Sequence, residues 1–305
     1  MGVSELADWV AVDWGTSNLR VWVLNSDQAV IAQLGSDHGM GSLVPDEFEA
    51  ALLGLVAPYL GDDTVPVICC GMVGARQGWQ EAAYVTVPSA PPGIGQATMV
   101  RARDPRIAPM ILPGMKQTAP ADVMRGEETQ IAGFIARHPD FDGVLCLPGT
   151  HTKWVQISAG EVVSFRTYMT GEIFALLSDR SVLRHSVQTS GWDDAAFADA
   201  IDDALGAPQN LASRLFGLRA ETLVNDMPAG VARARLSGQL IGVELAGARP
   251  YWLGQRIAIV GDPALSTLYQ TALGRQSVPV ELANGDAMTL AGLRAVYESW
   301  KVDQT

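Results

Sequence analysis

Two short polar turns, each following an apolar run, carry residues suited to binding phosphate. The first follows Asp13 and reads Gly15-Thr16-Ser17-Asn18. A turn of small residues exposes backbone N–H groups that bind phosphate oxygens, and its hydroxyls add short donors. A carboxylate before the turn can hold a hydrated Mg²⁺ beside those oxygens, because Mg²⁺ in proteins usually keeps several waters. Asp13 and this turn therefore predict a Mg²⁺-phosphate site, although an ordinary structural hairpin would explain the same residues.

The second turn has the same glycine and threonine but lacks the aspartate. Leu147 and Pro148 stand in the place of Asp13. We expect Lys153 to neutralise phosphate charge, since it is one of only three lysines in a chain with 21 Lys and Arg in total. The histidine could equally be a polar turn residue or a catalytic one. The turn reads Gly149-Thr150-His151-Thr152-Lys153.

The elements that position these turns repeat along the chain. Residues 9–33 align without a gap on residues 143–167, so that one Gly-Thr pair falls on the other. In each copy an apolar strand, the turn and two further strands predict an antiparallel meander. An internal repeat at a domain-sized spacing predicts two related domains.

The rest of the chain alternates between expected helices and strands. Residues 75–106 are rich in Gly, Pro and Arg and have little periodicity, and loops of that length are often functional. Amphipathic or capped segments predict helices over 45–60, 122–137, 171–188, 193–205, 208–217, 228–248, 264–273 and 287–300. Apolar runs predict strands over 65–70, 107–112, 256–260 and 278–282.

The composition excludes several classes of protein. A formal net charge of −12 argues against nucleic-acid binding and against an anionic-membrane anchor. The three cysteines, Cys69, Cys70 and Cys146, form no disulfide or zinc pattern and are expected to be buried thiols. Residues 1–8 lack a basic segment and an apolar core, and no apolar stretch is long enough to cross a bilayer. We therefore expect a cytoplasmic protein without membrane partners.

Taken together, these segments resemble the 2-dehydro-3-deoxygalactonokinase family of the actin/hexokinase/Hsp70-like ATPase superfamily. The bare Asp-x-Gly-Thr pattern is shared across the superfamily, whereas longer strings are specific to the family. Those strings are spread over almost the whole chain and read VDWGTSNLRVWVL, CGMVGARQGW, PADVMRGEETQIAGF, LPGTHTKWV, FRTYMTGEIFALL and IVGDPALSTLY.

The resemblance implies an α/β protein with the two-lobed actin-like ATPase (ribonuclease H-like) fold. Duplicated βββαβαβα units would flank an interlobe cleft that holds ATP and Mg²⁺. The resemblance assigns Gly261-Asp262, at the start of an expected helix, to the adenosine, although an ordinary strand-to-helix turn would look the same. We expect an N-terminal lobe over 1–140, with a substrate loop over about 71–106. A C-terminal lobe over 141–285 would lie on the nucleotide side. A helix over 286–305 would pack back on the first lobe.

A sugar kinase needs a base that accepts the proton of the attacking hydroxyl. By resemblance, a carboxylate lies near the end of the last strand of the first domain or in the helix after it. Asp122 ranks first, Glu128 second and Glu127 third, and the spacing does not decide between them. Asp122 would equally well cap a helix that begins at Val123.

The implied substrate is a 2-keto sugar acid, whose carboxylate needs a cation or N–H donors. Arg76 follows a strand end, and Trp79 could cover a sugar face. The N–H groups at the start of a helix near Thr170 could also face the ligand. Further candidates on strands or on the helix near the base are Arg20, Arg125 and Arg166.

The sequence thus predicts ATP-dependent phosphorylation of 2-dehydro-3-deoxy-D-galactonate at the C6 hydroxyl. The gluconate epimer is an open alternative as substrate, because the orientation of one hydroxyl distinguishes the two. A phosphatase of the same fold, with Glu128 orienting water, is a second alternative. A nucleotide-binding regulatory module is a distant third, since no residues remain for a peptide-binding domain. The sequence leaves open whether the chain is a monomer or a homodimer.

Overall fold

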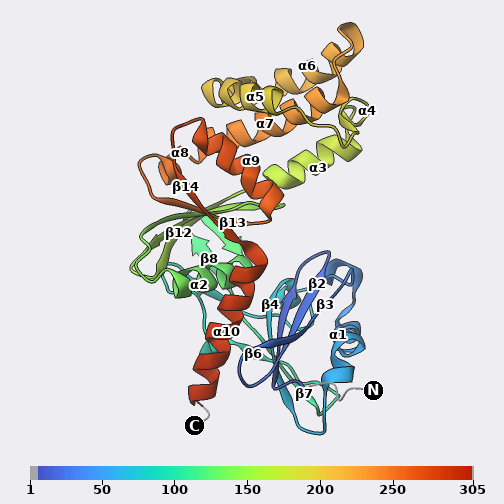
Figure 1. Cartoon of the computed structure of the whole chain (residues 1–305), viewed down its shortest axis with the longest axis vertical. Helices are drawn as coiled ribbons and strands as arrows, with labels where there is room; N and C mark the ends of the chain where they lie inside the picture. The colour runs from blue at the N-terminus through green and yellow to red at the C-terminus, as the bar shows by residue number, and fades with distance from the viewer. Residues whose placement is uncertain (1–5, 304–305) are drawn as a thin grey trace. The chain divides into compact units, whose positions relative to one another are not determined.

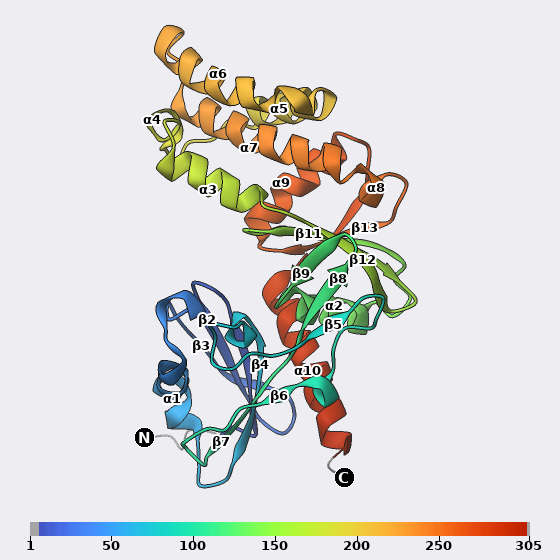
Figure 2. The same cartoon turned by 180° about the vertical axis from the view of Figure 1, so that it is seen from behind.

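The computed structural model describes residues 6–303 and divides the chain into two compact units. The first unit comprises Met1–Phe141, Ala159–Val163 and Gly285–Thr305, and the second comprises Asp142–Ser158 and Ser164–Asn284. Figures 1 and 2 show the elements of each unit from opposite sides. In the described part of the chain, no helix is both long and apolar enough to span a bilayer.

A six-stranded sheet forms the centre of the first unit, in the order β3-β2-β1-β4-β7-β6. β1, β2 and β3 form the expected antiparallel meander, whereas β1, β4 and β7 run parallel. The carboxyl ends of parallel neighbours meet at one edge of a sheet, where ligands of open α/β sheets bind. The strands are β1 (Trp9–Trp14), β2 (Leu19–Leu24), β3 (Val30–Ser36), β4 (Val65–Gly71), β6 (Thr98–Met99) and β7 (Ile107–Ile111).

Both faces of this sheet are covered, which explains the almost continuous apolar sequence of β1. Successive residues of a strand point to opposite faces of the sheet. Val12 accordingly packs in the cluster that contains α1 (Phe48–Val56), and Trp9 packs in the cluster that contains α10 (Gly285–Asp303). The Trp9 ring stacks on Tyr297 with the ring centroids 4.3 Å apart.

Helices α2 (Glu127–Arg137) and α10 lie side by side in both views (Figures 1 and 2). They cross at a contact that only glycine permits. A Cβ atom on Gly133 would lie 1.9 Å from the carbonyl oxygen of Met288. This contact fixes α10, from the end of the chain, against the first unit.

A small three-stranded sheet occupies part of the segment expected to be a loop and a helix. Its order is β5-β8-β9. The helix expected over 122–137 begins later, at Glu127, so that part of the prediction is wrong. Asp122 lies on a strand, opposite Gln117, and does not cap a helix. The strands are β5 (Tyr84–Thr86), β8 (Gly114–Thr118) and β9 (Ala121–Met124).

Short 3-10 turns complete the first unit. Two of them flank α1, so the helix expected over 45–60 is divided into three pieces. Two others, with β5 and β6, give local structure to the expected substrate loop. The turns are η1 (Met40–Ser42), η2 (Pro45–Glu47), η3 (Ala57–Tyr59), η4 (Met72–Gly74) and η5 (Ile94–Gln96).

The sheet of the second unit repeats the topology of the first. Its order is β12-β11-β10-β13-β14. β10, β11 and β12 form an antiparallel meander, and β13 and β14 run parallel to β10. This arrangement matches β3-β2-β1-β4-β7 strand for strand, so the predicted duplication is confirmed. The strands are β10 (Gly143–Leu147), β11 (Thr152–Ser158), β12 (Glu161–Tyr168), β13 (Ile257–Gly261) and β14 (Val280–Asn284).

Helices dominate the remainder of the second unit, and α5 and α7 lie side by side (Figures 1 and 2). The helix expected over 171–188 is interrupted at Ser181. Its hydroxyl donates to the carbonyl of Leu177 and accepts from the amide of Leu183, which competes with continued helical bonding. The helices are α3 (Thr170–Arg180), α4 (Arg184–Val187), α5 (Asp194–Gly206), η6 (Pro208–Asn210), α6 (Leu211–Val224), α7 (Ala229–Gly247), α8 (Arg249–Trp252) and α9 (Pro263–Gly274).

Candidate active site

The first polar turn connects β1 to β2 and is held from one side by the segment around η1. The amide of Gly15 donates to the carbonyl of Asn18 at 2.9 Å, which closes the turn. The carbonyl of Thr16 accepts from the amide of Gly41 at 2.9 Å. The side chains of Thr16, Ser17 and Asn18 remain exposed. The turn is therefore anchored through its backbone while its hydroxyls are available to a ligand.

Asp13 lies at the end of β1 with its side chain only 14% exposed. Arg20 Nη1 donates to Asp13 Oδ2 at 2.9 Å and lies 3.5 Å from Asp286. Burial raises the pKa of Asp13, the Arg20 charge opposes that rise, and the charges of Asp286 and Glu127 add to it. Arg20, a predicted substrate-binding residue, orients the carboxylate of Asp13 across the β1–β2 hairpin.

The second polar turn connects β10 to β11 and supports the N-terminus of α3. A Cβ atom on Gly171 would lie 2.3 Å from the carbonyl oxygen of Gly149, so only glycine allows this approach. The amide of Glu172 donates to the carbonyl of Thr150 at 2.9 Å, and His151 Nε2 lies 2.5 Å from Glu172 Oε2. The turn and the first residues of α3 form one continuous surface.

Two residues of the predicted second turn lie beneath it. Thr152 is fully buried, and its hydroxyl is 2.9 Å from the Tyr269 hydroxyl. Lys153 is 4% exposed, and its ammonium donates to the carbonyl of His151 at 3.2 Å. Both residues belong to β11, where successive side chains point to opposite faces, and both are buried, whereas Thr150 and His151 are exposed.

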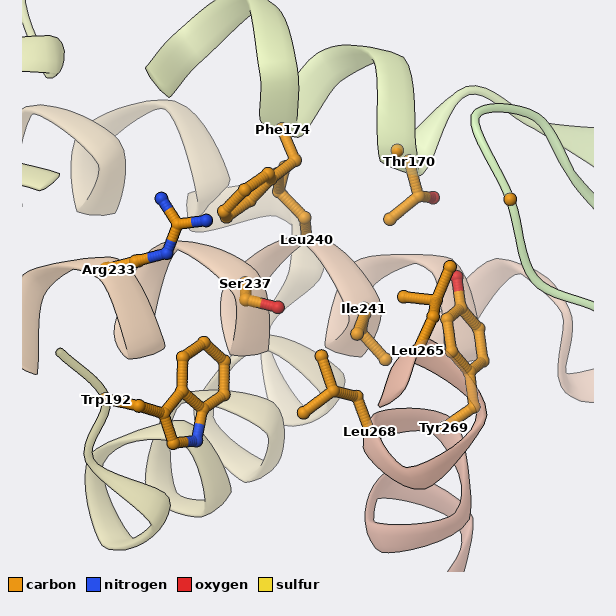
Figure 3. Close-up of a pocket in the computed structure, with 12 residues that line it drawn as sticks. Thr170, Phe174, Trp192, Arg233, Ser237, Leu240, Ile241, Leu265, Leu268 and Tyr269 are labelled. Carbon is orange, nitrogen blue, oxygen red and sulfur yellow. The ribbon is translucent and has the colours of Figure 1, made fainter. Parts of the chain in front are cut away.

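A cavity of about 160 Å³ opens beside the second turn. Gly149 and Gly171 form one side of it, while Leu265 and Leu268 come from α9. Figure 3 shows the ring of Phe174 near the guanidinium of Arg233, which lies 5.1 Å from the ring centre. The lining is largely apolar. Its members are Gly149, Thr170, Gly171, Phe174, Trp192, Arg233, Ser237, Leu240, Ile241, Leu265, Leu268 and Tyr269.

Sequence reasoning missed most of this cavity. Of its lining residues, only Gly149 and Thr170 were site candidates. The others come from α3, α7 and α9 and from Trp192 before α5, so they are far apart in the sequence, and most are ordinary apolar residues with core-like spacing. The Gly261-Asp262 pair, which was predicted, lies close by. The Asp262 carboxylate caps α9 by accepting from the amides of Ala264 and Leu265 at 2.9 and 3.1 Å.

Two glycines bring the start of α2 against the ends of β1 and β4. A Cβ atom on Gly71 would lie 2.7 Å from the carbonyl oxygen of Trp14 and 3.3 Å from Asp13 Oδ1. One on Gly126 would lie 3.3 Å from the Cα of Gly71. Gly71 and Gly126 have φ of +90° and +110°, values that glycine adopts readily. The acidic start of α2 is therefore built next to Asp13.

Glu128 is the buried acid of this group, with 1% exposure. Both of its carboxylate oxygens lie 2.8 Å from the amide of Gly126, and Glu127 accepts from the amide of Arg125 at 3.0 Å. Burial, reinforced by the charge of Glu127, raises the pKa of Glu128 to about 8. By contrast, Asp122 lies back on β9, where its carboxylate accepts from the amide of Val123 at 2.9 Å. The structure thus places Glu127 and Glu128, rather than Asp122, beside the ends of β1 and β4.

We expect Glu128→Gln to change how stability depends on pH. The folded-state pKa of about 8 lies above the ordinary 4.5, so the wild-type free energy of unfolding falls as the pH rises between these values. This one group lowers the free energy of unfolding by at most ~1.4 kcal/mol per pH unit, and the glutamine variant should not show this decrease. Urea unfolding at about pH 5 and about pH 8 measures the difference. Glu161→Gln, at an exposed position, is the control and should follow the wild type.

The remaining substrate candidates differ in exposure. Arg76 is 80% exposed and lies 3.6 Å from Glu81. The guanidinium of Arg125 is held over the Tyr84 ring, 4.2 Å from its centre. Trp79 packs against Trp14 and Phe48 at the edge of the core. Arg166 lies exposed on β12. The hydroxyl of Thr170 donates to buried Glu244.

The duplicated sheet and the two turns define a class of protein. The neighbouring solved structures have actin-like ATPase and sugar-kinase folds. One is the activator of 2-hydroxyisocaproyl-CoA dehydratase from Clostridium difficile with bound ADPNP. It superposes with a TM-score of 0.51 at 10% identity, and the alignment covers 97% of this chain and 96% of the activator. At that identity the likeness shows the fold alone, which confirms the predicted fold class.

The particular family follows from closer relatives. Residues 13–296 match the family model described as 2-keto-3-deoxy-galactonokinase, and the chain belongs to that family. It is 40% identical to a Rhizobium meliloti (strain 1021) protein named "Probable 2-dehydro-3-deoxygalactonokinase" and 34% identical to the Escherichia coli (strain K12) 2-dehydro-3-deoxygalactonokinase. These alignments cover 94% and 95% of this chain, and 95% and 97% of the relatives.

A crystal structure of a Sinorhizobium meliloti protein described as a 2-dehydro-3-deoxygalactonokinase agrees with this assignment. It superposes with a TM-score of 0.89 at 39% identity and covers 95% of this chain and 98% of its own. The predicted family is therefore confirmed over nearly the full length.

Proposed function

We propose that the protein transfers the γ-phosphoryl group of ATP to the C6 hydroxyl of 2-dehydro-3-deoxy-D-galactonate. The observation that carries this proposal is the nearly full-length similarity to proteins named for that activity, on a fold that has one polar turn in each unit. Phosphoryl transfer mainly requires positioning and charge stabilisation, which backbone amides and hydroxyls can supply.

In this proposal both turns bind phosphate oxygens of ATP. The exposed Thr16 and Ser17 hydroxyls serve in the first turn, and Gly149 and Thr150 serve in the second. The start of α3 adds backbone N–H groups, whose dipole favours anions. Lys153 supports the second turn from beneath through the carbonyl of His151.

The cavity beside the second turn is proposed to hold the adenosine. Its apolar walls and the rings of Phe174 and Trp192, which are drawn in Figure 3, support the placement of a planar base there. Gly261 lies at the same edge of the sheet, because a Cβ atom there would be 3.5 Å from the carbonyl oxygen of Pro148. Nucleotide specificity would then arise from residues that the sequence alone did not reveal.

Asp13 fits a Mg²⁺ site that is completed by phosphate oxygens and water. Burial raises the pKa of Asp13, the Arg20 charge opposes that rise, and the charges of Asp286 and Glu127 add to it, so a divalent cation would relieve the repulsion among these carboxylates. The described residues contain no cluster of three or more His, Cys, Asp or Glu that could hold a metal without the nucleotide. When bound, Mg²⁺ would neutralise the charge that develops on the transferred phosphoryl group.

Glu128 is proposed as the base, ahead of Asp122. As the C6 oxygen forms its bond to the γ-phosphorus, the hydroxyl proton passes to the carboxylate and the bond to ADP breaks. Burial raises the pKa of Glu128 to about 8 and makes it a stronger proton acceptor. Exposed Arg76, in the turn that follows η4, is proposed to bind the carboxylate of the sugar acid.

The reaction is tested by measuring ADP release with three acceptor conditions. We expect turnover with 2-dehydro-3-deoxy-D-galactonate, slower turnover with the gluconate epimer, and almost none without a sugar acid. Phosphorus NMR of the product should place the phosphate at C6. ADP release at the same rate without any acceptor would refute the kinase and favour a phosphatase of the same fold.

A further inference from the structure

A buried carboxylate joins several elements around the second polar turn. Glu244, on α7, is 2% exposed. Trp154 Nε1 donates to its Oε1 at 2.8 Å, and the Tyr269 hydroxyl donates to its Oε2 at 2.8 Å. The Thr170 hydroxyl also donates to Oε2. Three donors thus converge on one carboxylate in the core of the second unit.

The three donors come from the elements that surround the turn. Trp154 belongs to β11, which begins where the turn ends. Thr170 is the first residue of α3, whose Glu172 amide donates to the turn carbonyl of Thr150. Tyr269, on α9, also lies 2.9 Å from the Thr152 hydroxyl at the end of the turn. Glu244 therefore connects the end of the turn and the start of β11 to α3, α7 and α9.

The carboxylate is unusual because it has no cation to balance it. Among residues 6–303, Glu244 takes part in no ion pair. Burial raises its pKa to about 7, while the three donated hydrogen bonds oppose that rise. A buried charge without an ion partner is costly to fold, whereas an apolar residue would pack there at lower cost. The carboxylate accepts three hydrogen bonds and so fixes three side chains, which an apolar residue could not do.

The carboxylate contacts the wall of the proposed adenosine cavity from behind, through its donors. Two of its donors, Thr170 and Tyr269, line that cavity together with Gly149 of the turn. Any shift of Glu244 would therefore move the wall of the cavity and the turn at the same time. A displacement of about 1 Å in a binding constellation can change a rate by ~10²-fold.

We infer that Glu244 is a positioning residue, which holds the second polar turn, the start of α3 and Tyr269 in the arrangement that binds nucleotide. This inference rests on the proposed function, because it assumes that the turn and the cavity bind ATP. It assigns Glu244 no contact with the substrates.

The test compares nucleotide affinity with sugar-acid kinetics in Glu244→Gln. The amide keeps one acceptor and replaces the other by a donor, so the three hydrogen bonds that the carboxylate accepts cannot all keep their present direction. We expect the Kd of the ATP analogue AMPPNP, measured by calorimetry, to rise about tenfold or more, with the KM of the sugar acid within about twofold. Tyr269→Phe, which loses one hydroxyl and keeps its ring, should show a smaller rise in Kd and stay folded.

Ser178→Ala is the matched control, since Ser178 is also a buried hydroxyl on α3 but lies outside this network. Its Kd should equal that of the wild type. A lower Tm with unchanged AMPPNP affinity in both Glu244→Gln and Tyr269→Phe would overturn the inference and leave only a structural role. Failure of the wild type itself to bind AMPPNP would instead refute the proposed function, and the inference with it.

Discussion

Replacing Glu128 with glutamine is expected to lower kcat at least ~10²-fold, which is the lower end for removal of a general base. Glutamine keeps the volume of the side chain but cannot accept the proton of the C6 hydroxyl. Glu128 is buried and bonded to Gly126 next to the ends of β1 and β4, so its loss removes a proton acceptor that is already in place. The wild-type kcat should also rise with pH towards about 8, because the carboxylate must lose its own proton first. Steady-state kinetics with saturating ATP measure both effects.

Asp122→Asn and Glu127→Gln are the comparison variants for this prediction. Asp122 lies on the β8–β9 hairpin, and Glu127 bonds the amide of Arg125, so we expect each to retain a much larger part of kcat than Glu128→Gln. Circular dichroism should show that all three variants are folded. A large loss in Asp122→Asn with near-normal rate in Glu128→Gln would move the role of base to Asp122.

Replacing Asp13 with asparagine is expected to lower kcat by ~10²–10³-fold, as for loss of a group that stabilises charge in the transition state. The carboxylate is held near the end of β1 by Arg20. Asparagine removes the charge that would hold hydrated Mg²⁺ beside the phosphates. The Mg²⁺ concentration needed for half-maximal rate should therefore increase, and titration of Mg²⁺ at fixed ATP measures it.

Asp286→Asn is the matched control for Asp13. Its carboxylate is 51% exposed and lies 3.5 Å from the same Arg20, so this variant removes a nearby charge without removing the proposed Mg²⁺ ligand. We expect at most a few-fold change in kcat. If Asp13→Asn kept the Mg²⁺ dependence of the wild type, the proposed role of Asp13 would be wrong.

The sequence was sufficient to predict features that depend on local pattern. The two Gly-Thr turns align residue by residue because each strand of a meander needs the same alternation and the same tight connection. From that repeat followed the two related sheets, which the structure confirms in strand order and direction. The family was also accessible, since its specific strings are continuous segments of the chain.

The error at Asp122 shows where local pattern was insufficient. Residues 114–124 contain two short strands with a turn at Pro120, and neither has a long alternating run. These strands are stable because they pair with each other and with β5, a distant partner that local periodicity does not report. The helix therefore starts at Glu127, and the proposed base moves with it.

By itself, the sequence determined the duplicated fold, the family and the two exposed turns, because each of these is encoded in contiguous residues. Only the tertiary structure decided which side chains those turns present. Thr152 and Lys153 are both buried, although successive residues of β11 point to opposite faces of the sheet, and Arg20 reaches Asp13 because β1 and β2 pair in that register. The proposed adenosine cavity and the Glu244 network arise from residues far apart in the chain, which come together only when α3, α7, α9 and β11 pack around one turn.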